Sequence, residues 1–194
     1  RDGDDCGTPA QVGQPAALPH PRPGSILRAM DSLEEVRRLL AQSSDHDNPS
    51  AEALRTLFEK AWRIAVVGLS RDPAKTARRV PAYLAAKGFE LVPVNPRAER
   101  LLGREAHDTL SAVAEPVDLV LLFRPSAEVA PFVREAAARP EEPAIWLQEG
   151  ITAPEAVAAA RAEGRLVVQD LCAYKVHRAL QGAHRAARGL HPAP

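Results

Sequence analysis

A short apolar run, Ile64-Ala65-Val66-Val67, is followed directly by Gly68-Leu69-Ser70. An apolar run of this length that ends at a glycine is typical of a buried strand leading into a tight turn. Segments of helical period separate it from similar apolar runs at residues 89–94, 117–122, 144–147 and 166–168. This alternation predicts an α/β fold, in which helices cover both faces of a parallel five-stranded sheet.

The expected arrangement of the sheet is doubly wound and Rossmann-like. With the strands numbered along the chain, we expect the order 3-2-1-4-5. Ligands of such sheets bind beyond the carboxyl ends of the strands where the order reverses, here between strands 1 and 4. Pro81 and Pro131 lie in two of the helical segments. Because a proline inside a helix removes a backbone hydrogen bond, we expect both in first turns.

The segment before the sheet divides into two parts. Residues 1–29 are rich in Pro, Gly and Ala without an apolar period, which predicts a disordered extension. Met30 is the only methionine, so a natural start at Met30 is one hypothesis and a genuine extension is the other. Residues 30–62 show two helical patterns joined by a polar linker. The domain itself is expected over residues 63–182, and a flexible tail over residues 183–194.

Charge and cysteine content exclude several classes of protein. Lys+Arg and Asp+Glu both number 25, so the net charge is zero, which argues against a broad basic surface for nucleic acid or an anionic membrane. No apolar run approaches the ~20 residues of a membrane-spanning helix. The two cysteines, Cys6 and Cys172, lie far apart and match no metal or disulfide pattern. We therefore expect a cytoplasmic protein without a metal site.

Basic residues follow the first strand. Ser70 stands where a dinucleotide-binding loop has its second glycine, and Lys75, Arg78 and Arg79 come at the start of the next helix. Helix starts favour anions, because free N–H groups and the helix dipole point outward there. This pattern indicates a phosphate site; the alternative is a solvated basic helix start.

The ends of the later strands carry further candidate residues. Asn95-Pro96-Arg97 lacks the carboxylate typical of NAD sites, whereas Arg97 suits a phosphate on the ribose, as in NADP or coenzyme A. Phe123 and Arg124 could contact adenine and phosphate, or could be an edge-packed ring and a solvated cation. Gln148 can donate and accept hydrogen bonds, and Gly150 permits a tight turn or close approach.

Taken together, these strand ends resemble the stand-alone CoA-binding domain family, which shares its fold with a domain of the succinyl-CoA synthetase alpha subunit. The matching segments are I-A-V-V-G-L-S (64–70), V-P-V-N-P-R (92–97), E-P-V-D leading to F-R-P (115–125), W-L-Q-E-G-I (146–151) and D-L-C…K-V-H (170–177). Leu171 stands where the family usually has Arg, and Val176 where it often has Glu. These departures leave the role of residues 170–177 open.

The resemblance implies coenzyme A or an acyl-CoA as the ligand. It implies that the pyrophosphate is held by Gly68, Leu69 and Ser70 together with the basic residues that follow. The adenosine would be flanked by Asn95, Pro96 and Arg97. The opposite side of the cleft would be lined by Phe123, Arg124, Pro125, Gln148 and Gly150.

Three functions remain open at this point. The first is a CoA or acyl-CoA binder without catalysis of its own, because the sequence has no nucleophile elbow and no Walker motif. The second is an NADP-binding oxidoreductase-like protein. The third is an interaction module for an acyl-CoA ligase, and a homodimer is a further option. Cys172 and His177 could form a nucleophile–base pair. The alternative is that Cys172 is a small buried side chain of the core.

Overall fold

The structure is a computed structural model that describes residues 23–180 of the chain. Two helices come first, α1 (Pro23–Gln42) and α2 (Ala51–Lys60). The central elements follow as β1 (Arg63–Val67), α3 (Thr76–Ala86), β2 (Glu90–Val94), β3 (Arg100–Leu101), β4 (Arg104–Glu105), β5 (Leu119–Leu122) and α4 (Ser126–Ala137). The last are β6 (Ala144–Leu147), α5 (Pro154–Ala162), β7 (Val167–Val168) and α6 (Ala173–Ala179).

A five-stranded parallel sheet forms the centre of the molecule, in the order β2-β1-β5-β6-β7. The predicted α/β, doubly wound class is therefore confirmed. The predicted order 3-2-1-4-5 is wrong: in the same numbering the order is 2-1-3-4-5. The strand order reverses between β1 and β5, so the switch point lies beside β1 as expected but has a different neighbour.

The connection between β2 and β5 explains the difference. It contains a short β3–β4 hairpin instead of a helix, and then crosses to the α4 side of the sheet. There it buries Leu110, Val113 and Val117 against the sheet. The carboxylate of Asp118 accepts the backbone N–H groups of Trp62 and Arg63, which fixes the start of β5 beside the start of β1.

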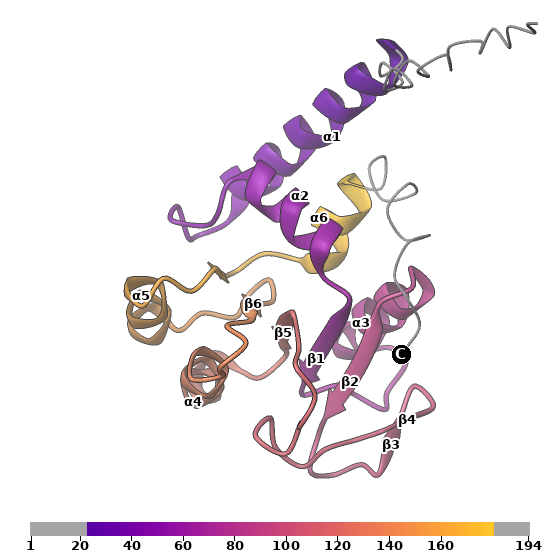
Figure 1. Cartoon of the computed structure of the whole chain (residues 1–194), viewed down its shortest axis with the longest axis vertical. Coiled ribbons are helices and arrows are strands. Elements are labelled where there is room, and N and C mark those ends of the chain that lie inside the picture. Colours follow the sequence, from indigo (N-terminus) through magenta and orange to yellow (C-terminus); the bar gives the residue numbers. More distant parts are fainter. Residues whose placement is uncertain (1–22, 181–194) are drawn as a thin grey trace, which may run out of the picture.

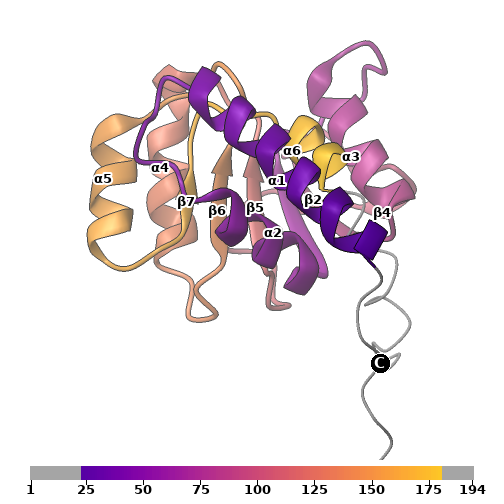
Figure 2. The same ribbon diagram turned by 90° about the horizontal axis from the view of Figure 1, so that it is seen from above.

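Helices cover both faces of the sheet (Figure 1). On one face α1, α2, α3 and α6 enclose a core that includes Trp146, Phe58 and Phe89. On the other face α4 and α5 pack with the β2–β5 connection. Figure 2 shows α1 lying across the same side of the sheet as α2 and α6. Among residues 23–180, no helix has the length and apolar character needed to cross a membrane.

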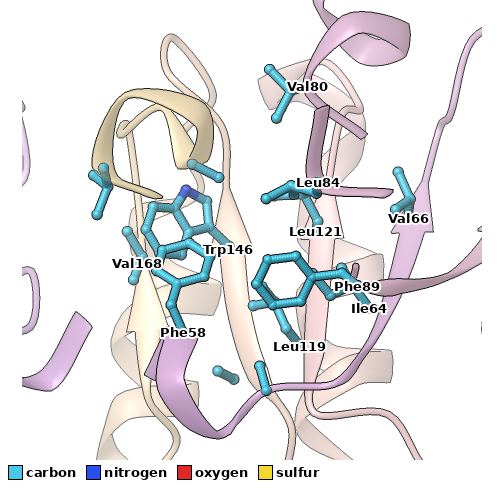
Figure 3. Packing of buried hydrophobic residues seen from close by; sticks show 14 of the residues in the cluster. Phe58, Ile64, Val66, Val80, Leu84, Phe89, Leu119, Leu121, Trp146 and Val168 are labelled. Atoms are coloured by element: carbon cyan, nitrogen blue, oxygen red, sulfur yellow. The ribbon is translucent and has the colours of Figure 1, made fainter. Parts of the chain in front are cut away.

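The helix α2 is an integral part of the core. Phe58 is fully buried, and its ring lies 5.5 Å from that of Trp146 and 6.1 Å from that of Phe89, measured between centroids. Figure 3 shows Phe58 reaching from α2 to the indole of Trp146 above the sheet. The segment before β1 therefore supplies one of the largest side chains of the domain.

The first helix begins earlier than predicted. Residues 23–29, expected to be disordered, are helical, because α1 starts at Pro23. In the sequence, Ile26 and Met30 continue the helical spacing of Leu33 and Val36 backwards, and a proline is favoured at a first helical position. The predictions for residues 1–22 and 181–194, including the flexible tail, lie outside the described residues.

The linker between α1 and α2 covers the outer side of β7. The Asn48 carboxamide donates to the carbonyl of Gln169 and accepts from its N–H, as a neighbouring strand would. Ser43 Oγ donates to the same carbonyl, and the Arg161 guanidinium donates to the carbonyl of Val167. Arg161 is itself paired with Asp45 of the linker at 2.8 Å. These side chains engage the outward-facing groups of a two-residue strand.

Candidate functional site

Two adjoining hollows lie beyond the carboxyl ends of β1 and β2. The inner hollow, of about 440 Å³, is lined by Val67, Gly68, Val94, Asn95, Pro96, Arg97, Asp108, Thr109, Arg124, Phe132 and Glu135. The outer hollow, of about 590 Å³, is lined by Arg71, Pro96, Arg97, Ala98, Glu99, Glu105, Ala106 and Asp108. They share Pro96, Arg97 and Asp108, so together they form one cleft at the switch point of the sheet.

Three guanidinium groups face this cleft from different loops. Arg71 follows β1, Arg97 follows β2 and Arg124 follows β5. Arg71 and Arg97 make no ion pair with any residue in the described part of the chain, whereas Arg124 pairs with Glu128. Carboxylates also line the cleft, namely Glu99, Glu105, Asp108 and Glu135. The cleft thus has guanidinium groups at separate positions, in a lining that also contains carboxylates and apolar residues.

The structure brings together five of the residues that the sequence singled out, Gly68, Asn95, Pro96, Arg97 and Arg124. The other candidates line neither hollow: Leu69, Ser70, Lys75, Arg78, Arg79, Phe123, Pro125, Gln148 and Gly150. Leu69 is fully buried in the core, and Phe123 packs against the same core. Pro125 is the N-cap residue of α4. The lining also contains residues that sequence reasoning missed, Arg71, Asp108, Thr109, Phe132 and Glu135.

Two backbone amides expected to hold a diphosphate are engaged inside the protein. The N–H of Gly68 donates to the carbonyl of Val94, and that of Ser70 donates to the carbonyl of Ala77. The reason lies in Pro81, which is inside α3 rather than in its first turn. Pro81 has no N–H for the carbonyl four residues back, which is that of Ala77, so Ser70 supplies the missing donor. Pro131 likewise lies inside α4.

The start of α3 keeps donors for an anion. Thr76 and Ala77 are its first two residues. The N–H groups at the start of a helix have no carbonyl one turn earlier to which they could donate. The N-cap residue Lys75 makes no capping hydrogen bond with its side chain, and it is exposed. Arg79 is exposed in the same turn, and Arg78 is partly exposed. The predicted basic helix start is therefore present, but its basic residues line neither hollow.

Asn95 links two of the loops around the cleft. Its side-chain amide donates to the carbonyl of Leu69 at 2.9 Å, and its side-chain oxygen accepts the N–H of Arg97 at 2.9 Å. Both ends of the carboxamide are thus used to hold the β1–α3 loop against the turn after β2. Asn95 lines the inner hollow, but its polar groups act chiefly to position Arg97.

Residues after β6 form a separate polar group, which Asp170 organises. The Asp170 carboxylate accepts the Gly150 N–H at 2.6 Å and the Ser44 hydroxyl at 2.5 Å. Burial raises the pKa of Asp170, but the hydrogen bonds from Ser44 and Gly150 outweigh it, so its pKa lies below the ordinary value. Gln148 is buried, and its side-chain oxygen accepts the Ala173 N–H at a long 3.4 Å. Within the described residues, its side-chain nitrogen has no partner.

Cys172 and His177 both have structural surroundings. Cys172 is a free, buried thiol. His177 is 1% exposed, its Nδ1 lies 3.0 Å from the Tyr83 hydroxyl, and its ring is surrounded by Phe58 and Phe89. These contacts favour packing over a nucleophile–base pair. Within the described residues, no group of three or more His, Cys, Asp or Glu side chains could hold a metal ion.

Gly68 is required by packing at the centre of the cleft. It has a φ of +83°, and a Cβ placed on it would lie 3.1 Å from Arg124 Cδ and 3.2 Å from the Phe123 carbonyl oxygen. We expect Gly68→Ala to lower the free energy of unfolding by about 2–4 kcal/mol, since left-handed strain and crowding add. Chemical denaturation of the purified variant measures this.

Gly164 offers a matched control for Gly68. It has the same φ of +83°, but nothing lies within 4 Å of an added Cβ. Gly164→Ala should therefore cost only the strain, about 1–2 kcal/mol. Equal losses for the two variants would show that the contact with Arg124 and Phe123 carries no weight.

Comparison with known proteins identifies a family for most of the chain. Residues 62–178 match the model of the CoA binding domain family. The uncharacterized protein YneT of Bacillus subtilis is 35% identical over 130 residues, which cover 67% of this chain and 96% of YneT. A Thermus thermophilus protein, cell-free ID.343, has a solved structure that is 38% identical with a TM-score of 0.64, and the match covers 68% of this chain and 99% of that one.

A larger enzyme contains a similar unit. The apo acetyl-coenzyme A synthetase 1 of Ca. Korarchaeum cryptofilum is 25% identical with a TM-score of 0.51. The match covers 60% of this chain but only 28% of the synthetase. The chain has a parallel sheet with a cleft at its switch point. Because residues 62–178 match the family model, this chain belongs to the CoA binding domain family.

Proposed function

We propose that the protein binds coenzyme A or an acyl-CoA in the cleft formed by the inner and outer hollows. The observation that carries this proposal is the placement of Arg71, Arg97 and Arg124 around one cleft at the switch point of the sheet. Coenzyme A carries a diphosphate and a ribose phosphate, and guanidinium groups are well suited to phosphate oxygens. Membership of the CoA binding domain family supports the same ligand.

The polar groups suggest how the ligand would lie. Arg97 belongs to both hollows and is held by Asn95, so it is the natural partner for the phosphorylated ribose. Arg124 and the uncapped start of α3 flank the end of β1 and would contact the diphosphate. Ser70 would contribute its hydroxyl rather than its amide, because the amide is bonded to Ala77. The apolar ring of Phe132 would face the adenine.

The decisive experiment is titration of the purified protein with CoA, acetyl-CoA and NADPH, followed by isothermal calorimetry. We expect saturable binding of CoA or acetyl-CoA and much weaker binding of NADPH, because the loop after β1 has only Gly68 where dinucleotide sites typically have a glycine-rich loop. Tight binding of NADPH without binding of CoA would replace this proposal by an NADP-binding one. Mass spectrometry of small molecules released from the purified protein gives independent evidence.

We propose binding without catalysis as the activity of the domain. Incubation with acetyl-CoA should release no free thiol above the rate without protein, and release at a catalytic rate would overturn this part. The unit matches about a quarter of a synthetase chain, so we also propose an acyl-CoA ligase as a partner. A homodimer and a cytoplasmic location remain parts of the proposal.

A further inference from the structure

The side chain of Arg124 lies against Gly68, and both residues line the inner hollow. Its Cδ comes within 3.1 Å of the position that a Cβ on Gly68 would take. The guanidinium then extends along α4, 5.9 Å from the centre of the Phe132 ring. The Arg124 guanidinium therefore rests against the protein, on the wall of the cleft.

A carboxylate of the same chain is already hydrogen-bonded to this guanidinium. Arg124 Nη2 donates to Glu128 Oε2, from one turn further along the chain at the start of α4. Its Nε is buried and has no partner among the described residues. One N–H of Nη2 is thus bound to Glu128 and Nε is buried, so a further acceptor would have to use the N–H groups of Nη1 or the second N–H of Nη2.

The pair is built so that it can be exchanged. The side chains of Arg124 and Glu128 are 39% and 52% exposed, and exposed pairs of this kind contribute little stability. The other charged groups facing the inner hollow are Arg97, Asp108 and Glu135. Of these carboxylates, that of Glu135 already accepts the Ser111 N–H. A phosphate that approaches Gly68 would therefore compete with the Glu128 carboxylate for the Arg124 guanidinium.

We propose that Glu128 is a built-in competitor for the phosphate groups of the ligand. This inference rests on the proposed function. The Glu128 carboxylate holds Arg124 when the cleft is empty, and a phosphate must displace this carboxylate to bind the guanidinium. Only a ligand that contacts Arg124 has to make this exchange, so the exchange lowers the affinity for ligands that place a phosphate at the end of β1. Glu128 thus weakens the binding of ligands with phosphates at the end of β1 and leaves the binding of ligands without phosphates unchanged.

The test compares Glu128→Gln with the wild-type protein in calorimetric titrations with CoA, ADP and adenosine. Removing the competing charge should raise affinity for CoA and ADP by about three- to ten-fold. The gain has two sources: the ligand no longer has to break the Arg124–Glu128 ion pair, and the carboxylate no longer repels the phosphates. Affinity for adenosine should be unchanged. Unchanged affinity for CoA and ADP would overturn the inference, as would an equal gain for adenosine.

Two controls separate competition from a general effect of charge. Glu59→Gln breaks another Arg–Glu pair of the same spacing, with Arg55 on α2, and should leave all affinities unchanged. In an Arg124→Ala background, Glu128→Gln should lose most of its effect, because the contested cation is gone. A gain that persists undiminished in that background would contradict the proposal.

The two proposals can fail independently. If the wild-type protein binds neither CoA nor ADP, the proposed function is wrong. If the wild-type protein binds them and Glu128→Gln gives no gain, only the role of Glu128 is wrong. Circular dichroism of each variant, compared with the wild type, ensures that a lost effect reflects binding rather than folding.

Discussion

Replacing Phe58 by alanine is expected to lower the free energy of unfolding by about 3–5 kcal/mol, the range for a large aromatic side chain removed from a core. Phe58 is fully buried and contacts the rings of Trp146, Phe89 and His177 (Figure 3). The loss would open a cavity where α2 meets the sheet. Urea denaturation followed by tryptophan fluorescence measures it, because Trp146 lies at the same place.

This result would show that the segment before β1 belongs to the domain, although the family model begins only at residue 62. Phe58→Leu serves as the control, since a smaller apolar side chain should cost less than about 1.5 kcal/mol. If Phe58→Ala cost under 1 kcal/mol, α2 would be a loosely attached element, and the described packing against Trp146 would be of little consequence.

Replacing Arg97 by alanine is expected to weaken CoA binding by about 10- to 100-fold, which corresponds to the 1.5–3 kcal/mol of a hydrogen bond to a charged group. Arg97 lines both hollows, and its backbone is held by Asn95. The variant should also bind CoA and dephospho-CoA with nearly equal affinity, because the guanidinium that we propose to contact the ribose phosphate is absent. Calorimetric titration with both ligands provides the comparison.

Arg134 offers a matched control for Arg97. It is an exposed arginine in the last turn of α4 and lines neither hollow. Arg134→Ala removes the same charge from the protein and should leave the affinity for CoA within about two-fold, as an exposed site outside the cleft would. Similar losses for the two variants would mean that overall charge, and not a specific contact, determines binding.

The positions of the strands could be predicted from the sequence because each strand is a short apolar run between turn residues. The runs that begin at Ile64 and Ala144 were placed almost to the residue. The predicted strand order 3-2-1-4-5 was wrong, because the order depends on where the long connection from β2 to β5 crosses the sheet. That connection has no regular period, and only its contacts show that Leu110 and Val113 lead it to the α4 side.

The site was predictable where a strand end leads directly into it. Gly68, Arg97 and Arg124 follow three different strands and meet in one cleft, as residues at the carboxyl edge of a parallel sheet do. Asp108 and Thr109 escaped prediction because they lie in the connection without a pattern. The use of the Ser70 amide could not be foreseen either, since it depends on a carbonyl that Pro81 leaves unpaired in α3.

The polar covering of β7 has a consequence for how copies of this chain can associate. Asn48, Ser43 and Arg161 already saturate the carbonyls through which a strand from another molecule would add. At the far side of the sheet, His107 exchanges backbone hydrogen bonds with Pro93 and Asn95 in the same manner. These contacts oppose the addition of a further strand at β7 and at the Pro93 end of β2. A second copy that added a strand at β7 would first have to displace Asn48 from the backbone of Gln169.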